Sequence, residues 1–424
     1  MNVQKTYERT IKMSVFDKAR IILPKNCDME KWSVVACDQY TSEPQYWESV
    51  KKTVGNAPST LNMIFPEIYL NDGDADERTA KINDAMKKCL ENGSVYETEP
   101  CLIYVERTLE NGSVRKGIVG VIDLEEYDFN VGSQSKIRAT EGTVLERIPP
   151  RVKVRCDALL EFPHVMLLID DDKKEIIEKI DKSVLEPIYN FSLMENSGRI
   201  KGYKITDTDE ILEKLENLGD RKTFEEKYSV SGKGVLQYAV GDGNHSLATA
   251  KTCYENEKAK IGDKAKNLPL RYALVEVVNL HDESLVFEPI HRVVFGVDEE
   301  KFVNALSEKY QIEKADKGDF EIVSNGTKTA YVIKNPDFNL TVGCIQSFID
   351  GYLKENGGSV DYIHGASVAE KLAEEKGNAG ILLNAMQKSD LFKTVILDGA
   401  LPRKTFSMGE ACDKRFYLEG RKIR

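Results

Sequence analysis

The sequence predicts a mixed fold of the α/β or α+β class, in which helices pack on a sheet. Three observations support this prediction. Strand-like apolar runs fill the first part of the chain, and helical spacing of apolar residues begins after Asp172. A strand, a glycine turn and a helix then follow one another over 234–258. No internal repeat or low-complexity tract interrupts the pattern.

The first third of the chain is predicted to be rich in strands. A short apolar run covers 33–37, and two longer runs cover 101–109 and 114–124. The longer runs flank Glu110-Asn111-Gly112-Ser113, and an Asn-Gly turn between two such runs is a strong hairpin signal. Another buried strand is expected at 165–169.

The middle of the chain is predicted to alternate between helices and strands. Apolar residues at helical spacing indicate helices at 176–185 and 207–218. The chain then returns to a strand at 234–240, which a helix follows at 246–258. A long apolar strand is expected at 268–280.

A second unit is expected to begin near Val297, because 424 residues exceed the usual size of one domain. Its predicted elements are a helix at 299–309, a hairpin through Asn325-Gly326, helices at 348–353 and 366–375, and a strand at 380–385. We therefore expect two units. Residues 1–296 form a core that contains the Asp242–His245 turn, and residues 297–424 form a smaller C-terminal α/β unit.

Composition excludes several classes of protein. No run approaches the roughly 18 consecutive apolar residues that a membrane span needs, and residues 1–11 lack the apolar segment of a signal peptide. The eight cysteines are scattered without a CxxC pair, which indicates reduced thiols and no zinc site. We therefore expect a cytoplasmic protein without a membrane partner and without a metal site of its own.

The charge distribution favours a small anionic ligand. A formal net charge of −11 argues against nucleic acid as the main partner, because phosphate-backbone binding depends on clustered Lys and Arg. One segment differs from the rest of the chain: between Lys136 and Arg155 there are six basic residues and two acidic ones. Such a local excess suits a small anion better than a duplex.

The most specific motif in the sequence is Gly241-Asp242-Gly243-Asn244-His245-Ser246, which follows a strand and opens a helix. The free N–H groups of the first helical turn and the helix dipole make an anion site at such a place. The glycines permit unusual φ angles and close approach of a ligand. Asp242 could hold a metal or a hydroxyl, and His245 could donate to a phosphate or shuttle a proton. The alternative is an ordinary capped helix start, with Asp242 or Asn244 as the cap.

This turn nearly matches the GxGxxG pattern of dinucleotide-binding folds. It lies more than half-way along the chain, however, and no acidic residue ends the following strand. Asp263 has about the right spacing, but it lies in a polar loop before that strand. A Rossmann site is therefore not expected. Neither a Walker A loop nor an HExxH helix is present.

Two further motifs supply candidate groups. In the first, Arg138 and Arg151 flank Glu141, so that the arginines could bind a phosphate or carboxylate and Glu141 could act as a general base. Its alternative is a surface salt-bridge network around a Pro-Pro turn. In the second, an apolar strand ends at Asp38, which would project into a cleft. Its alternative is a polar turn that caps a helix at 44–51.

The remaining basic and imidazole groups carry weaker signals. The pair His291-Arg292 follows a strand and could contact a phosphate. His164 and His364 are expected to be structural. The segment 401–406 could bring a late basic pair to the site, or form a solvated tail.

Together these motifs resemble a bacterial and archaeal family known as domain of unknown function 1015, some members of which carry a ParB-like label. The family pattern has an early strand ending in a polar turn, an acidic-threonine motif, an Asp-Gly-His-His-Arg turn, a His-Arg pair and a late Pro-x-Lys-Ser/Thr. Here these elements appear as Cys37–Tyr40, Thr140–Thr143, Asp242–Ser246, His291–Arg292 and Pro402–Thr405.

The glycine turn also resembles the nucleotide site shared by ParB-type CTPases, sulfiredoxins and free-serine kinases. This resemblance implies a ParB/sulfiredoxin-like mixed-sheet core with large insertions, and a nucleotide such as ATP or ADP, with Mg²⁺, at the turn. Sulfiredoxins place a catalytic cysteine where this chain has Asn244, so their chemistry is not expected. The family arginine is Ser246 here, so Arg138, Arg151 or Arg292 would have to replace it.

We therefore expect phosphoryl transfer between a nucleotide and a small hydroxyl compound, with free serine implied by the kinase resemblance. The expected catalytic residues are Asp38, Glu141, Asp242 and His245, of which Asp38 or Glu141 is the base. The residues expected to bind phosphate or ligand are Arg138, Arg151, Gly241, Gly243, Asn244, Ser246, His291 and Arg292. Two alternatives stay open: a phosphatase of a phosphorylated amino acid, and a non-catalytic nucleotide-binding switch of ParB type. In each case the partner is a small phosphorylated or amino-acid ligand.

Overall fold

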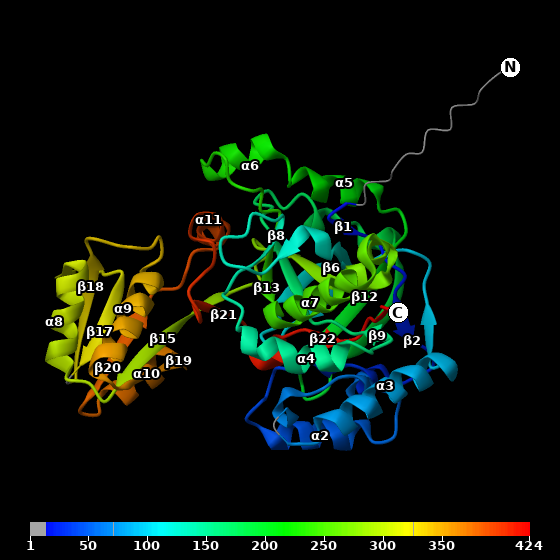
Figure 1. The fold of residues 1–424 in the computed structure, drawn as a ribbon, viewed down its shortest axis with the longest axis horizontal. Helices are drawn as coiled ribbons and strands as arrows, with labels where there is room; N and C mark the ends of the chain where they lie inside the picture. Colours follow the sequence, from blue (N-terminus) through cyan, green and yellow to red (C-terminus); the bar gives the residue numbers. More distant parts are fainter. Residues whose placement is uncertain (1–13, 71, 325) are drawn as a thin grey trace.

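A computed structural model of the chain describes residues 14–70, 72–324 and 326–424 (Figure 1). The predicted absence of a signal peptide at 1–11 and the hairpin residue Asn325 lie outside the described residues. Within the described ranges, no helix is long and apolar enough to cross a membrane.

A ten-stranded mixed sheet forms the centre of the larger lobe. Its strands are, in spatial order, β11 (Glu186–Ser192), β12 (Arg199–Ile205), β5 (Leu102–Thr108), β6 (Val114–Asp123), β14 (Tyr272–Asn279), β10 (Met166–Ile169), β13 (Tyr238–Asp242), β8 (Ile137–Ala139) and β7 (Tyr127–Asp128), with β1 (Phe16–Asp17) beside β6. Strand β10 runs parallel to β14, and β13 runs parallel to β8, whereas β10 and β13 are antiparallel. This mixed sheet confirms the predicted fold class.

A seven-stranded sheet forms the smaller lobe, which stands apart from the larger one in Figure 1. Its strands are β16 (Ile312–Lys314), β18 (Thr327–Ile333), β17 (Phe320–Ser324), β20 (Asn378–Leu383), β15 (Phe287–Phe295) and β19 (Ser359–His364), with β21 (Phe406–Met408) on the first half of β15. Its helices are α8 (Glu299–Tyr310), α9 (Thr341–Asn356) and α10 (Ala366–Ala373). These elements lie where the sequence predicts helices and a hairpin.

The end of the chain returns to the larger lobe. Strand β22 (Phe416–Tyr417) pairs with β3 (Val34–Val35), and β23 (Arg421–Lys422) pairs with β9 (Leu160–Glu161). Pairing therefore crosses the predicted boundary at 296/297 in both lobes, since β15 also pairs with β19 and β20. The division into 1–296 and 297–424 stays a prediction about independent folding.

The remaining elements cover the sheets and connect them. They are α1 (Met29–Trp32), α2 (Pro44–Val54), α3 (Ala75–Glu91), α4 (Ile148–Arg155), α5 (Asp209–Asn217), α6 (Arg221–Tyr228), α7 (Asn244–Ile261), α11 (Lys388–Asp398), β2 (Ile22–Pro24) and β4 (Val95–Glu97). Helix α4 packs against α7. Its prolines occupy the first helical turn, where a missing N–H costs nothing.

The prediction of a helix at 176–185 is wrong. Only short 3-10 turns form there, at Ile177–Lys179 and Lys182–Val184. Aspartate side chains accept backbone N–H bonds in this segment: Asp171 binds the amide of Ile176 at 2.9 Å, and Asp181 binds that of Ser183 at 2.9 Å. Such local bonds compete with a helix, and tertiary burial of the isoleucines accounts for their apolar spacing.

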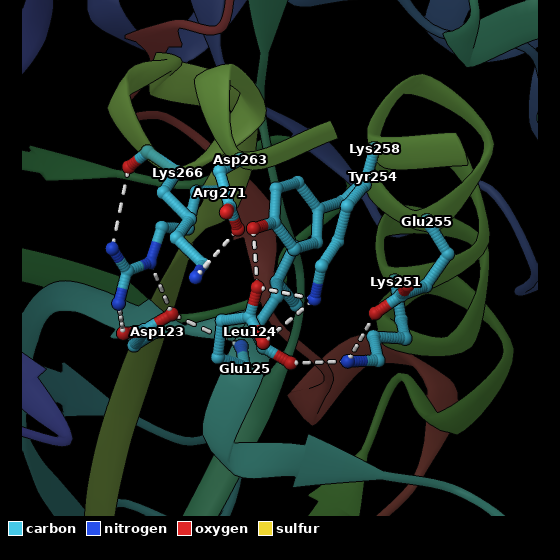
Figure 2. A network of polar contacts seen from close by, with 10 residues as sticks. All are labelled: Asp123, Leu124, Glu125, Lys251, Tyr254, Glu255, Lys258, Asp263, Lys266 and Arg271. Carbon is cyan, nitrogen blue, oxygen red and sulfur yellow. Dashed lines mark hydrogen bonds and ion pairs between the residues drawn. The ribbon is translucent and has the colours of Figure 1, made fainter. Parts of the chain in front are cut away.

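A polar network fixes the C-terminal half of α7 against the 3-10 turn that follows β6 (Figure 2). The Glu125 carboxylate accepts hydrogen bonds from Lys258 Nζ at 2.7 and 2.9 Å and from the Tyr254 hydroxyl at 2.5 Å. Burial alone would raise the pKa of Glu125, but these hydrogen bonds lower it overall. Lys251 Nζ binds the carbonyl of Leu124 at 2.8 Å. The network therefore anchors α7 to the end of β6.

Candidate functional site

Five chain segments meet at the carboxyl end of β13. Antiparallel pairing of Met166 with Asp242 brings the start of β10, and thus His164, to one side of this end. Parallel pairing of Ala139 with Val240 brings the residues after β8 to the other side. The β3–β22 pair contributes Asp38 after β3 and residues 414–417 around β22. Residues distant in sequence are thus gathered by strand pairing alone.

Helix α7 begins at this point with an uncapped N-terminus. Its N-cap is Gly243, at a φ of 80°, and no described side chain accepts a hydrogen bond from its first turn. A Cβ at Gly243 would lie 3.0 Å from the Cα of Val165, so both the left-handed backbone and the tight packing require glycine. Asp242 instead accepts the N–H of Gly243 at 2.8 Å. The free amides of the first turn can therefore bind an anion.

Asp38 and His164 form the first charged pair of the site. His164 Nε2 lies 3.6 Å from Asp38 Oδ2, and Gln39 Nε2 donates to Asp38 Oδ1 at 3.0 Å. Burial alone would raise the pKa of Asp38, but the charge of His164 and its hydrogen bond lower it. Burial alone would lower the pKa of His164, but Asp38 raises it overall. The pair therefore favours an ionised carboxylate.

His164 is buried and links this pair to two other segments. Its Nδ1 lies 2.7 Å from the Tyr417 hydroxyl, which also accepts the N–H of Cys37 at 3.1 Å. Its Nε2 lies 3.4 Å from Ser246 Oγ, in the first turn of α7. One imidazole thus connects the early motif, the glycine turn and the C-terminal segment.

Asp242 and Lys414 form the second charged pair. Lys414 Nζ lies 3.3 Å from Asp242 Oδ2, and both side chains are mostly buried. Glu141 lies close enough for both charges to affect it. Burial chiefly raises the pKa of Glu141, the charge of Asp242 adds to that effect, and Lys404 and Lys414 oppose it. Three carboxylates and two lysines therefore share this end of the sheet.

Buried arginines hold the backbone that carries Lys414. Arg107 Nη2 donates to the carbonyl of Cys412 at 2.9 Å, and Arg115 Nη1 donates to that of Asp413 at 3.0 Å. On the other side of Lys414, the Arg415 guanidinium is buried between two carboxylates, those of Glu276 and Glu419. The backbone is therefore held both before and after Lys414.

His245 and Arg151 form the basic edge of the site. Burial and the charges of Arg151 and Arg147 lower the pKa of His245 to about 4, so the imidazole is neutral near pH 7. Asn244 Oδ1 and His245 Nε2 are buried and have no hydrogen-bond partner among the described residues. The Arg151 guanidinium pairs with Glu67, whose amide donates to the Cys37 carbonyl at 2.8 Å. Two polar atoms without a partner among the described residues thus lie in the first turn of α7, where the charges of Arg151 and Arg147 reach His245.

A metal site made only from protein ligands is not evident in the described ranges, which contain no group of three or more His, Cys, Asp or Glu arranged to hold an ion. The carboxylates are instead paired with lysine or histidine. Asp38 pairs with His164 and Asp242 pairs with Lys414.

A model of the family described as "Protein of unknown function (DUF1015)" matches residues 22–352. The chain belongs to this family. No curated protein matches the chain.

Several solved structures are similar to this DUF1015 protein. A mutant free serine kinase in complex with ADP has a TM-score of 0.38 at 10% identity, and the match covers 74% of this chain and 93% of the kinase. SbnI with a C-terminal truncation, from Staphylococcus aureus, has a TM-score of 0.36 at 10% identity, covering 70% and 85%. A conserved hypothetical protein from Pyrococcus furiosus has a TM-score of 0.35 at 11% identity, covering 72% and 94%. At such scores the likeness assigns no chemistry to the site.

Arg138, His291 and Arg292 are expected to bind phosphate in this DUF1015 protein, but all three have partners elsewhere. Arg138 and His291 are described first. Arg138 is buried and donates to the carbonyls of Ser135, at 2.8 Å, and Gly234, at 2.5 Å. His291 Nδ1 accepts the amide of Leu383 at 3.1 Å within the smaller lobe.

Arg292 joins the smaller lobe to the segment after α11. It donates to Gln346 Oε1 at 3.3 Å and to the carbonyl of Arg403 at 3.1 Å. Burial lowers its pKa to about 10, and the charge of Glu141 is near enough to oppose that effect in part. Arg292 thus lies beside the site, but its hydrogen bonds brace the lobe junction.

Sequence reasoning missed His164 and Lys414. His164 was expected to be structural because a lone histidine beside a proline carries no motif, yet it contacts Asp38 and Ser246. Lys414 stands in a segment with no recognisable pattern. The two residues of the expected late basic pair have different partners. The charge of Lys404 lowers the pKa of Glu141, whereas Arg403 Nη2 pairs with Asp350 at 3.0 Å. Only the return of β22 to β3 could have placed Lys414.

Proposed function

We propose that this protein is a phosphotransferase that uses a nucleotide, ATP or ADP with Mg²⁺, and a small hydroxyl compound. One observation carries the proposal: the uncapped N-terminus of α7 lies between the ionised Asp38 and the Lys414–Asp242 pair. Phosphoryl transfer needs mainly positioning, charge neutralisation and an acceptor for the hydroxyl proton. Each of these needs has a matching group at this end of the sheet.

The anionic phosphates would lie on the first turn of α7. No side chain in the described part of the structure caps the amides of Asn244, His245 and Ser246, and the helix dipole favours negative charge there. Neutral His245 can donate or accept one hydrogen bond without a charge change near pH 7. Lys414, which pairs with Asp242, and Arg151, which pairs with Glu67, place cationic groups beside this turn, and the charge of Arg151 reaches His245. Charge neutralisation in a partly buried site is the main contribution that a protein makes to this chemistry.

Asp38 is the candidate base that is already ionised. Its pKa is lowered, chiefly by His164 against the opposing effect of burial, so Asp38 can accept a proton near pH 7, while the lower pKa also makes it a weaker base. The pKa of Glu141 is raised by burial and by Asp242, which makes Glu141 a weaker candidate at low pH. The chemistry then runs in one step: Asp38 takes the hydroxyl proton as the acceptor oxygen bonds to phosphorus and the bond to the leaving nucleotide oxygen breaks.

The test is turnover with labelled ATP, ADP and CTP, each with and without a hydroxyl acceptor such as serine. We expect label to move to the acceptor, and Asp38→Asn to lower kcat by roughly 100- to 10,000-fold with the fold retained. Glu43→Gln is the matched control, because Glu43 is an exposed carboxylate in the same segment. Release of phosphate from a phosphorylated amino acid instead would indicate a phosphatase. Saturable binding with no turnover would indicate a switch. Either result would overturn the proposal.

A further inference from the structure

A half-open pocket of about 160 Å³, called the cavity below, lies directly behind the polar site. It is bounded by α4 and α7 on one side and by residues around β9 and β14 on the other. Most of its wall is apolar and buried. Representative side chains are Met63, Met86, Leu160, Phe162 and Leu274.

The cavity is kept open by small side chains. Ala158, Ala250 and Ala273 line it, and each is buried. Protein interiors are close-packed, and voids larger than a water molecule are few, because the lining atoms lose dispersion contacts. Three alanines at one void therefore leave a space that larger side chains would fill.

The cavity and the polar site share a wall. His164, Ser246 and Tyr417 line the cavity, and the same three residues connect Asp38 to the first turn of α7. A ligand whose polar end contacts Asp38 or the α7 amides can therefore place another part of itself in the cavity.

The charged residues in the cavity wall are already paired. Arg151 is paired with Glu67, and Glu161 is paired with both Arg155 and Arg421. His164 is paired with Asp38. Among the described residues the wall therefore presents no unpaired charge, and a charged group there would lose its hydration without compensation. A neutral apolar group is the chemistry that this space accepts.

The size of the cavity sets the size of the occupant. An apolar protein cavity of about 150 Å³ holds one benzene molecule. We propose that the cavity binds a neutral apolar group about the size of a benzene ring, carried by the hydroxyl acceptor. Serine has no such group. The statement that the hydroxyl acceptor carries this group rests on the proposed function. The statement that the cavity binds an apolar group does not.

The direct test uses benzene as the probe and thermal unfolding of the full chain as the readout. We expect saturating benzene to raise the Tm of the wild type. Ala250→Leu and Ala273→Val each add atoms to the space, so benzene should not raise the Tm of either variant. Ala379→Val is the matched control, because Ala379 is a buried strand alanine in the smaller lobe. Its Tm should still rise with benzene.

Three results would overturn the proposal. The first is no benzene effect on the wild type. The second is an equal effect on the wild type and on Ala250→Leu and Ala273→Val when both variants unfold cooperatively. The third is loss of the effect in Ala379→Val. If one cavity variant fails to fold, the other still gives the comparison, since they lie on different elements, α7 and β14.

The acceptor panel separates this inference from the proposed function. Phenylserine should exceed serine in kcat/KM by at least roughly 10-fold, because a matched apolar group is worth that much discrimination, and Ala273→Val should remove the difference. Benzene binding with no phosphoryl transfer to any acceptor would contradict the proposed function alone. Transfer to serine and phenylserine at equal rates, with no benzene effect, would contradict the cavity assignment alone.

Discussion

Lys414 Nζ lies 3.3 Å from Asp242 Oδ2, which joins the C-terminal segment to the glycine turn. Arg107 and Arg115 hold the two carbonyls that precede Lys414, so the backbone that carries the lysine is fixed. A charged side chain fixed in this way costs little reorganisation when a ligand binds. The Lys414 ammonium group is therefore a preorganised positive charge that can bind an anion, rather than half of a surface salt bridge.

We expect Lys414→Met to lower turnover on the order of 100-fold, as removal of one fixed stabilising group does in other active sites. The apolar stem of methionine retains most of the packing, so the Tm should change little. Lys422→Met is a suitable control, because Lys422 pairs with Glu97 away from the glycine turn. Equal losses in both variants would show that Lys414 has no special place in the reaction.

Arg151 and Arg138 should behave differently, although both belong to the same basic segment. Arg151→Ala is expected to weaken ADP binding by roughly 1.5–3 kcal/mol, the usual value for a hydrogen bond to a charged group. Arg138→Ala should leave affinity unchanged and lower the free energy of unfolding by about 1–3 kcal/mol. The reason is that it leaves the half-buried carbonyls of Ser135 and Gly234 without the Arg138 donors. Calorimetric titration with ADP and urea unfolding measure the two effects. Loss of affinity in Arg138→Ala without loss of stability would reverse these roles.

Much of the fold follows from local sequence patterns, as the β5–β6 hairpin and α7 show. The glycine turn was predictable because a strand, two glycines and a helix lie together in sequence. His164, Tyr417 and Lys414 were not, because they reach the site only through the β10–β13 and β3–β22 pairings. Strand pairing between distant segments leaves no periodic signal in the sequence. The guanidinium of Arg138 likewise points to backbone carbonyls for tertiary reasons that its basic surroundings did not reveal.

The free energy of unfolding should fall at alkaline pH, because His164 loses its proton there. Its pKa is raised in the folded state, because Asp38 outweighs the effect of burial. This contribution is therefore complete below the unfolded pKa of about 6.5 and is lost as the pH rises through the folded value. Urea unfolding at pH of about 6 and about 9 should show a larger loss in the wild type than in His164→Gln. Parallel losses in the two proteins would mean that the imidazole carries no charge in the folded state.

His245 should have the opposite effect on stability. Burial, Arg151 and Arg147 lower its pKa to about 4, so the unfolded chain binds a proton more readily than the folded one. Stability should therefore rise with pH between about 4 and about 6.5, and His245→Gln should flatten that rise. An anion bound at the first turn of α7 would favour the charged imidazole and raise this pKa. NMR titration of the five histidines, with His245→Gln to assign the resonance, measures it directly. We expect the His245 signal to titrate near pH 4 in the free protein and at a clearly higher pH with saturating ADP. A midpoint that ADP leaves unchanged, in a protein that binds ADP, would place the phosphates away from the glycine turn.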